Sequence, residues 1–426
     1  MIGVHSGKYI AERETARIRE ATRRLDVSHP VVNDRQYRIW RAFAVRAWPT
    51  LVVIDPAGNV LGSHAGEFTA DMLEPLIERL VARHDTAGAI DRTPLEDTPD
   101  ESSVAPGALR YPGKVIVAGD RLAIADTGHH RILVGTLGAR GGDGRWPFAT
   151  THALGDGTSG FADGAAARFA SPNGLALVGE TLLVADTGNH AVRAVDLGTG
   201  VVRTVAGTGQ QLRTRRERSA GALSSPWDLA VLEGSTYIAM AGSHQLWALR
   251  GMTEHAGAEV AAGTGAEDIA DGAAGDALLA QPMGMVAAGD GRRLYFADAE
   301  SSAVRSFEPD ERRAGRAVGE VHTIVGTGLF DFGDKDGIGE AVRLQHPQGV
   351  TVHGSGRLLV ADSYNDSVKW VDPITRRVES WLGGLHEPGG LAYDPIRRVV
   401  FIADTNAHRI LAVDELTRAA TEIEIL

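Results

Sequence analysis

The chain has 426 residues, of which 43% are hydrophobic, 43 are Lys or Arg, 55 are Asp or Glu, and none is Cys. This length predicts two domains or a repeat array. The net charge of −12 disfavours a nucleic-acid partner, because an acidic surface repels phosphate backbones. The lack of cysteine excludes disulfides, thiolate nucleophiles and Cys-ligated metal centres within these residues.

Residues 1–84 are predicted to form a small α/β layer in the order strand, helix, strand, helix, strand, strand, helix. Asp34 is predicted to cap the second helix and Thr69 the last one. An apolar strand is predicted at residues 50–54. Residues 85–110 contain Pro and Glu and are predicted to be a linker.

From residue 111 to residue 426 one phrase recurs six times. It opens with Pro-x-Gly-hydrophobic and closes about 15 residues later with Ala-Asp and a turn. The openings are Pro112, Pro172, Pro226, Pro282, Pro347 and Pro388. Each copy holds four short apolar and β-branched runs, which predicts four strands. Six such units predict a mainly β fold, a six-bladed β-propeller.

The last copy ends in a β-type run at residues 421–426. We therefore expect it to supply its own fourth strand, and the first and sixth units to meet through side-chain packing alone.

The repeats resemble the NHL family. The resemblance lies in Pro172-Asn173-Gly174-Leu175 and in the segment Val-Ala-Asp-Thr-Gly-Asn-His-Ala-Val-Arg at residues 184–193. The same register returns at residues 125–132 and 403–410, so the resemblance spans the chain from about residue 110 onward.

Residues 1–84 resemble a thioredoxin-like domain of the redoxin type, on the segment Ala-Trp-Pro-Thr at residues 47–50. The resemblance implies a cis peptide bond before Pro49. The family's central strand and Cys-x-x-Cys helix would precede residue 2 and are absent from the sequence. We therefore expect a truncated, redox-inactive remnant of a longer parent, and the two parts together resemble the thioredoxin-domain/NHL-repeat proteins.

Five of the six closing turns carry an aspartate at the same point. They are Asp126, Asp186, Asp298, Asp362 and Asp404. Carboxylates in a ring can be metal ligands or catalytic groups, as in six-bladed propeller lactonases, or they can accept backbone N–H bonds in turns. A site needs unlike residues from different units, so the repetition favours the turn role, and we predict no catalytic residue and no metal. The histidines in these turns are expected to be structural or solvated; they are His129, His130, His190 and His408.

The third copy breaks the pattern, because Met240 replaces the turn aspartate. Trp227, Asp228, His244 and Trp247 lie nearby in the sequence. Exposed Trp and Met suit a protein-binding surface, so these five residues are the candidate partner-binding site. The alternative is that the aromatic side chains pack between blades. A basic run at residues 213–218 is either a solvated loop or a contact for an acidic partner.

These patterns favour a non-catalytic interaction or scaffold module without a cofactor, whose partner is a protein or a small ligand at a propeller face. Two alternatives stay open: a thiol–disulfide oxidoreductase in a full-length parent, and a metal-dependent propeller hydrolase or lyase. No run approaches the roughly 18 apolar residues of a membrane span, and the first residues lack the pattern of a signal peptide. We therefore expect no membrane partner and a cytoplasmic location.

Overall fold

The computed structural model describes residues 1–66, 68, 70–93, 107–142, 144–213, 217–218, 220–310 and 318–426. The chain divides into two compact units, Met1–Ser103 and Val104–Leu426. Thr69, the predicted helix cap, and most of the predicted linker lie outside the described residues.

The first unit has its elements in the predicted order. They are β1 (Gly3–His5), a 3-10 turn (Ala11–Arg13), α1 (Thr15–Arg24), β2 (Val31–Asn33), α2 (Arg38–Ala42), β3 (Thr50–Ile54), β4 (Val60–Ala65) and α3 (Ala70–Thr86). The strands form two separate pairs, β1 with β2 in parallel and β3 with β4 in antiparallel register. No strand pairing joins these two pairs among the residues that the structure describes.

Asp34 organises the turn into α2. Its carboxylate accepts the backbone N–H groups of Arg38, Ile39 and Trp40 at 2.7, 3.1 and 2.9 Å, as a capping side chain does, although Tyr37 occupies the N-cap position itself. The Trp48–Pro49 peptide bond is cis. The Trp48 indole N–H donates to the Ser6 carbonyl oxygen at 2.7 Å, which ties the start of β3 to the end of β1.

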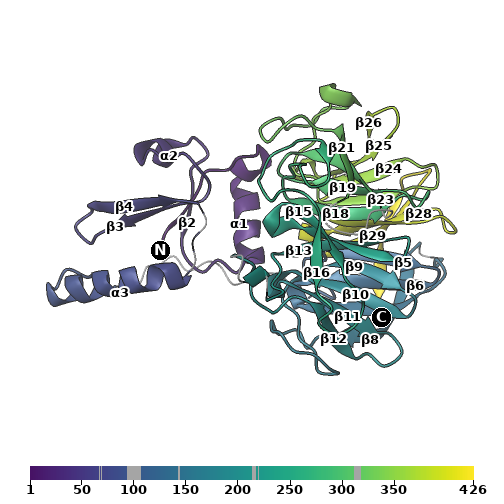
Figure 1. The fold of residues 1–426 in the computed structure, drawn as a ribbon, viewed down its shortest axis with the longest axis horizontal. Helices are drawn as coiled ribbons and strands as arrows, with labels where there is room; N and C mark the ends of the chain where they lie inside the picture. The colour runs from purple at the N-terminus through teal and green to yellow at the C-terminus, as the bar shows by residue number, and fades with distance from the viewer. Residues whose placement is uncertain are drawn as a thin grey trace. The chain divides into compact units, whose positions relative to one another are not determined.

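The second unit is built from antiparallel meanders of four strands, of which the described residues form six (Figure 1). The first three consist of β5 (Lys114–Ala118), β6 (Arg121–Asp126), β7 (Arg131–Leu137) and β8 (Trp146–Leu154); β9 (Pro172–Val178), β10 (Thr181–Asp186), β11 (Ala191–Asp196) and β12 (Val202–Ala206); and β13 (Pro226–Leu232), β14 (Ser235–Met240), β15 (Gln245–Leu249) and β16 (Ala258–Ala262). The last three consist of β18 (Pro282–Ala287), β19 (Leu294–Asp298), β20 (Ala303–Pro309) and β21 (Gly319–Val325); β23 (Gly349–Val352), β24 (Leu358–Asp362), β25 (Ser367–Val371) and β26 (Arg377–Leu382); and β27 (Pro388–Asp394), β28 (Val399–Asp404), β29 (Arg409–Asp414) and β30 (Ala420–Ile425). Two short strands, β17 (Gly272–Ala273) and β22 (Gly337–Ile338), extend the fourth and fifth meanders.

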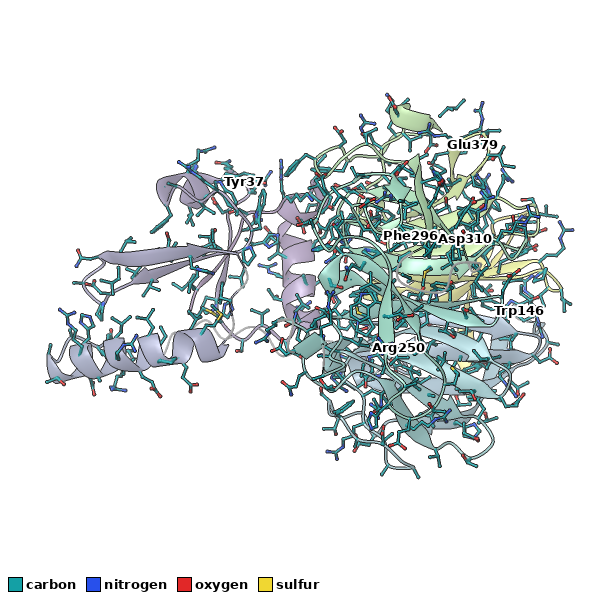
Figure 2. The ribbon with its side chains drawn as sticks, viewed as in Figure 1. Tyr37, Trp146, Arg250, Phe296, Asp310 and Glu379 are labelled. Atoms are coloured by element: carbon teal, nitrogen blue, oxygen red, sulfur yellow. The ribbon has the colours of Figure 1, made fainter. Side chains whose placement is uncertain are left out.

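The meanders close into a ring. The first strands of consecutive meanders contact one another, and β27 contacts β5, so these six strands surround the ring axis. A separate apolar cluster fills each junction between neighbouring meanders, including the junction of the sixth with the first, where Phe401 packs near Leu122. Figure 2 labels Phe296 of β19, whose side chain is fully buried in the cluster between meanders three and four. Every apolar face is therefore covered by a neighbour, as repeat architectures require.

The closure of the ring differs from the sequence-based expectation. The sixth meander does supply its own fourth strand, but β30 also pairs in parallel with β8, and Ile423 lies opposite Trp146. The Leu426 N–H donates to the Phe148 carbonyl oxygen at 2.9 Å. The expectation of side-chain packing alone was wrong, because both outermost strands offer free backbone groups that satisfy each other.

Candidate functional site

The five turn aspartates are fully buried and bind the backbone of their own meander. In each, Oδ1 accepts an N–H from the segment that leads into that meander, at 2.6 to 2.9 Å. The donors are Arg110, Ala170, Ala280, Gln345 and His386. This geometry agrees with the turn-forming role that the repetition favours.

The second oxygen of each aspartate faces a basic side chain. The partners are Arg131, Arg193, Arg305, Lys369 and Arg409, at 2.7, 2.7, 3.0, 3.9 and 2.8 Å. In meanders two, four and five the cation lies seven residues after the aspartate and is itself fully buried. Buried charges of this kind need a partner, so each pair is occupied in holding its own turn.

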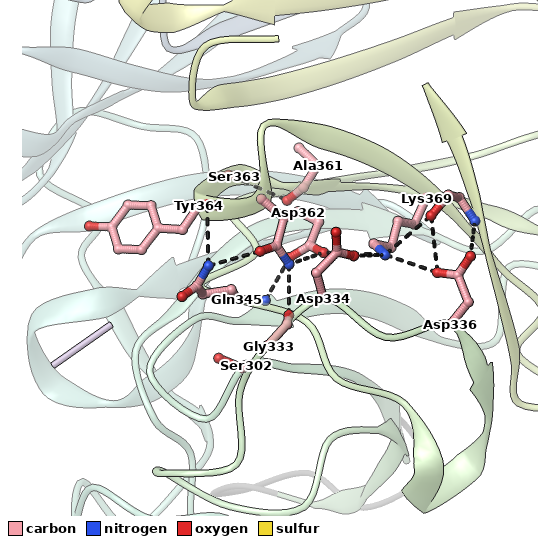
Figure 3. Close-up of polar contacts among 12 residues, drawn as sticks. Ser302, Gly333, Asp334, Asp336, Gln345, Ala361, Asp362, Ser363, Tyr364 and Lys369 are labelled. Atoms are coloured by element: carbon pink, nitrogen blue, oxygen red, sulfur yellow. Dashed lines mark hydrogen bonds and ion pairs between the residues drawn. The ribbon is translucent and has the colours of Figure 1, made fainter. Parts of the chain in front are cut away.

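In the fifth meander the cation faces more carboxyl groups than in the other meanders described above (Figure 3). The Lys369 ammonium group bonds to Asp334 and Asp336 and stands 3.9 Å from Asp362. Burial raises the pKa of Asp362 to about 7, although N–H groups of Gln345 and Asn365 donate to it. Burial likewise raises the pKa of Asp186 to about 6. One ammonium group thus serves three carboxyl groups, one of which burial drives toward its neutral form.

Histidines in the turns tie neighbouring meanders together. The Nδ1 atoms of His130, His190, His244 and His408 accept the N–H groups of Ser171, Ser225, Gln281 and Tyr111 at 3.0 to 3.1 Å. Ser302 and Asp366 accept the corresponding N–H groups in the remaining two junctions. Burial lowers the pKa of His190, which favours the neutral ring that can accept a hydrogen bond. The turn histidines with these bonds therefore have a structural role, while His129 bonds to Asp126 instead.

In the third meander, apolar residues take the places of the buried turn aspartate and its basic partner. The Met240 sulfur accepts the Ser224 N–H at 3.4 Å, in place of an aspartate oxygen. Met240 is 0% and Trp247 3% exposed, and both lie in the cluster between meanders two and three. This burial corrects the expectation that they form an exposed contact surface. Trp227 is half-buried, and His244 is occupied in its junction.

Asp228 has a different and unforeseen role. Its carboxylate forms an ion pair with the Lys114 ammonium group at 2.5 Å and accepts the Met285 N–H at 2.9 Å. Lys114 lies on β5 and Asp228 on β13, so the pair passes over β9 on the axis side of the ring. Gly174 of β9 leaves the necessary space, since a Cβ there would stand 2.3 Å from the Asp228 Cα.

The sequence carried a signal for this pair. Lys114 and Asp228 occupy the third position of the Pro-x-Gly phrase, where the other four copies have glycine. Two exceptions of opposite charge indicate a contact across the ring. The pair is buried, with 8% and 2% of the two side chains exposed, and it crosses from the first meander to the third.

Sequence reasoning also missed a polar cluster between meanders five and six. Glu415 accepts hydrogen bonds from Tyr393 at 2.6 Å and His353 at 3.0 Å, and it pairs with Arg398. The His353 ring packs against the rings of Trp370 and Tyr393, at 5.0 and 4.3 Å between centroids. The hydrogen bond from Tyr393 holds the pKa of Glu415 at about 2, and burial raises that of Tyr393 to about 12. These residues come from β25, from β27 and from the turns that follow β23, β27 and β29, a combination that no sequence spacing reveals.

Two further expectations concern metals and membranes. Among the described residues, no group of three or more His, Asp or Glu side chains is arranged to hold a metal ion. No helix within the described ranges is long and apolar enough to cross a membrane. Of the basic run at 213–218, residues 214–216 lie outside the described residues.

The chain is similar in sequence to known proteins with NHL repeats. NHL repeat-containing protein 2 from Gallus gallus is 36% identical, over 100% of this chain and 63% of the relative. Protein SUPPRESSOR OF QUENCHING 1, chloroplastic, from Arabidopsis thaliana is 34% identical, over 97% of this chain and 41% of the relative. These similarities support an NHL-type propeller.

The chain spans less than two thirds of the length of these curated relatives. No protein-family model matches it. Among solved structures, one from a nidogen/laminin complex is 14% identical and aligns with a TM-score of 0.47, over 71% of this chain and 93% of that chain.

Proposed function

We propose that residues 111–426 are a six-bladed propeller that acts as a non-catalytic interaction module. One observation carries this proposal: the polar residues that recur around the ring are bonded within it. The five aspartates bind backbone N–H groups and cations, and four histidines accept N–H groups of the next meander. A catalytic site needs convergent groups that remain available to a substrate.

The charged residues near the ring axis also support a non-catalytic role. Lys114 and Asp228 neutralise each other there and are buried, so neither offers an open charge to a ligand. The alternative of a metal-dependent hydrolase or lyase needs a convergent set of oxygen or nitrogen ligands. The described residues contain no such set.

For residues 1–84 we propose a thioredoxin-like domain without redox activity of its own. The order of its elements supports this proposal. The 426 residues contain no cysteine, so this part cannot carry out thiol–disulfide exchange by itself.

The proposal is tested with the full chain immobilised and exposed to cell extract, followed by size-exclusion chromatography of the recovered complex. We expect a stoichiometric protein complex that survives EDTA. In parallel, the free chain is incubated with lactone and ester substrates, with and without added Ca²⁺, Mg²⁺ or Zn²⁺. Turnover that a metal restores after EDTA would contradict the proposal and favour the hydrolase alternative.

A further inference from the structure

Each meander ends its second strand in a turn whose last residue has a left-handed backbone conformation. In meanders two and three that residue is a histidine, His190 with φ 49° and His244 with φ 51°. The His190 Nδ1 atom accepts the N–H of Ser225 at 3.0 Å, and the His244 Nδ1 atom accepts the N–H of Gln281 at 3.1 Å. These two bonds tie meander three to both of its neighbours.

The two bonds require neutral imidazole rings. A ring nitrogen accepts an N–H through its free lone pair, so Nδ1 must be unprotonated and Nε2 must carry the hydrogen. A proton added at Nδ1 removes that lone pair and sets one donor against another, so the bond is lost. Between meanders four and five, the Ser302 hydroxyl accepts the corresponding N–H, from His346, at 3.3 Å. A hydroxyl acceptor has no such change of state near neutral pH.

A hydroxyl contact that supports the first of these junctions has no counterpart at the second. Between meanders two and three, the Thr187 hydroxyl donates to the Pro226 carbonyl oxygen at 2.7 Å. The equivalent residue of meander three is Ala241, which has no hydroxyl. The bond to His244 therefore carries a larger share of the polar contact between the turn and meander four. The apolar cluster between meanders three and four lies elsewhere in the junction, so losing this bond loosens the turn without unfolding the ring.

The charged groups around His190 come from its own turn and from the loop before meander three. Burial and the nearby Arg213 guanidinium lower the pKa of His190 from its ordinary value of 6.5. Asp186, in the same turn, pairs with Arg193 at 2.7 Å. Burial raises the pKa of Asp186 to about 6, so proton uptake by that carboxyl group stabilises the fold in acid, whereas proton uptake by His190 destabilises it.

The ion pair next to the second junction belongs to meander four. Asp298 accepts the N–H of Ala280, the residue before Gln281, at 2.9 Å and pairs with Arg305 at 3.0 Å. Burial raises the pKa of Asp298 as well. Within the described ranges of the chain, no charged side chain bonds to His244. A proton on this ring therefore has no bonded carboxylate to offset the lost hydrogen bond.

We propose that His190 and His244 form an acid-sensitive latch, which releases the turn end of meander three from meanders two and four when the two rings take up protons. This inference goes beyond the proposed interaction function and does not depend on it. A partner that contacts this end of the ring would meet a different surface in acid than at neutral pH.

The sign of the effect follows from His190. Its pKa is lowered in the folded protein, so the folded state binds fewer protons than the unfolded state as the pH falls below 6.5. The stabilisation from the latch is therefore fully present above pH 6.5 and is lost as the pH falls through the pKa of the folded state.

The first test measures which nitrogen carries the hydrogen, by ¹⁵N NMR of the histidine rings in the full chain at about pH 7.5. Signals are assigned by their loss in His190→Asn and His244→Asn. We expect both rings to be neutral with the hydrogen on Nε2. A hydrogen on Nδ1 of either ring at this pH would overturn the inference, because that ring could not accept the N–H.

The second test measures amide hydrogen exchange at Ser225 and Gln281 at about pH 7.5 and about pH 5, corrected for the intrinsic effect of pH on exchange. In the wild type, both amides should exchange at least about fivefold faster at the lower pH, as expected for the loss of one hydrogen bond. In His190→Asn/His244→Asn the two corrected rates should agree. Asparagine places Oδ1 where Nδ1 lies, tolerates the left-handed backbone and does not ionise.

Two controls separate the latch from a general effect of acid. The Glu387 amide donates to Asp366 at 3.0 Å in the junction between meanders five and six, where the acceptor is not a histidine, and its corrected rate should stay constant. His322→Asn, at a side chain 49% exposed, should keep the wild-type response. Equal acceleration at Glu387, or the same acceleration in the double variant as in the wild type, would overturn the inference. If the double variant is unstable at neutral pH, the wild-type ring spectra and the wild-type rates at the three amides still decide.

Discussion

Met240 and Trp247 occupy, in meander three, the two positions that a buried aspartate and its cation occupy in meanders two, four and five. The interval of seven residues is the same as that between Asp186 and Arg193. The Met240 sulfur even accepts the equivalent N–H, from Ser224. An ion pair and an apolar pair thus fill the same place in one ring, as expected where a buried ion pair is close to energetically neutral relative to apolar packing.

This relationship predicts the effect of restoring one charge. Met240→Asp should lower the free energy of unfolding by about 3 kcal/mol, because the new carboxylate is buried without a cation. Adding Trp247→Arg should recover part of the loss. Chemical denaturation measures both, and Met240→Leu serves as the control, with a loss below about 1.5 kcal/mol. A double variant less stable than Met240→Asp alone would show that the two positions are not equivalent.

The Lys114–Asp228 pair predicts strong coupling between two meanders that are not adjacent. Lys114→Met should cost about 3 kcal/mol of unfolding free energy, because it leaves the buried Asp228 carboxylate without its cation. The double variant Lys114→Met/Asp228→Asn should be more stable than Lys114→Met, since the amide is neutral and its oxygen still accepts the Met285 N–H. The exposed pair of Arg121 and Glu180 gives the control, and Arg121→Ala should cost less than about 1 kcal/mol. Additive losses in the double variant would argue against the pair.

The raised pKa of Asp362 predicts a specific pH dependence. This carboxyl group has a pKa of about 7 in the folded protein, against an ordinary value of 3.8, so the folded state binds more protons than the unfolded state across that interval. Its contribution to stability is therefore present below about pH 4 and is lost as the pH rises toward 7.

The test compares denaturation of the wild type and Asp362→Asn between pH 4 and 7. An asparagine in this place cannot ionise, so the variant should lack the loss of stability that Asp362 causes as the pH rises. The free energy of unfolding of the wild type minus that of Asp362→Asn should therefore fall steadily from pH 4 to pH 7. Asp196→Asn is the control, because backbone and side-chain hydrogen bonds from Thr199 lower the pKa of that exposed group. Parallel curves for wild type and Asp362→Asn would show that Asp362 is ionised throughout.

The pairing of β30 with β8 predicts that the outer edge contributes to ring closure. Ile423 is 4% exposed in the cluster shared by meanders six and one, so Ile423→Ala should cost about 2–5 kcal/mol. Ile396→Ala, at a side chain 81% exposed, should change stability by less than about 0.5 kcal/mol. Thermal melts and denaturant titrations distinguish the two, and similar small effects would show that β30 is dispensable for closure.

The repeated part of the fold could be predicted because each copy carries the same local signals. Strands, turn aspartates and their backbone bonds depend on residues close in sequence, as in the bonds from Arg110 to Asp126 and from His386 to Asp404. The third copy was misread because Met240 was compared only with the aspartates. Comparing Trp247 with Arg193 and Arg305, at the same interval, would have indicated a buried substitution.

Contacts between copies that are far apart in the sequence could not be predicted from local sequence patterns. The bond from Tyr111 N–H to His408 joins residues 297 positions apart, and the Lys114–Asp228 pair joins residues 114 positions apart. The Glu415 cluster likewise depends on how the hairpins of meanders five and six meet. Sequence periodicity specifies each meander, but the geometry of the closed ring decides which side chains face each other.

The parallel pairing of β8 with β30 also bears on synthesis. Ribosomes produce β8 with the first meander, and its outer edge then has no partner until β30, the last strand of the sixth meander, emerges. During that interval the edge is open to other nascent chains, and intermolecular strand pairing competes with ring closure. Slowed translation between the first and sixth meanders should therefore increase aggregation of this protein in the cell.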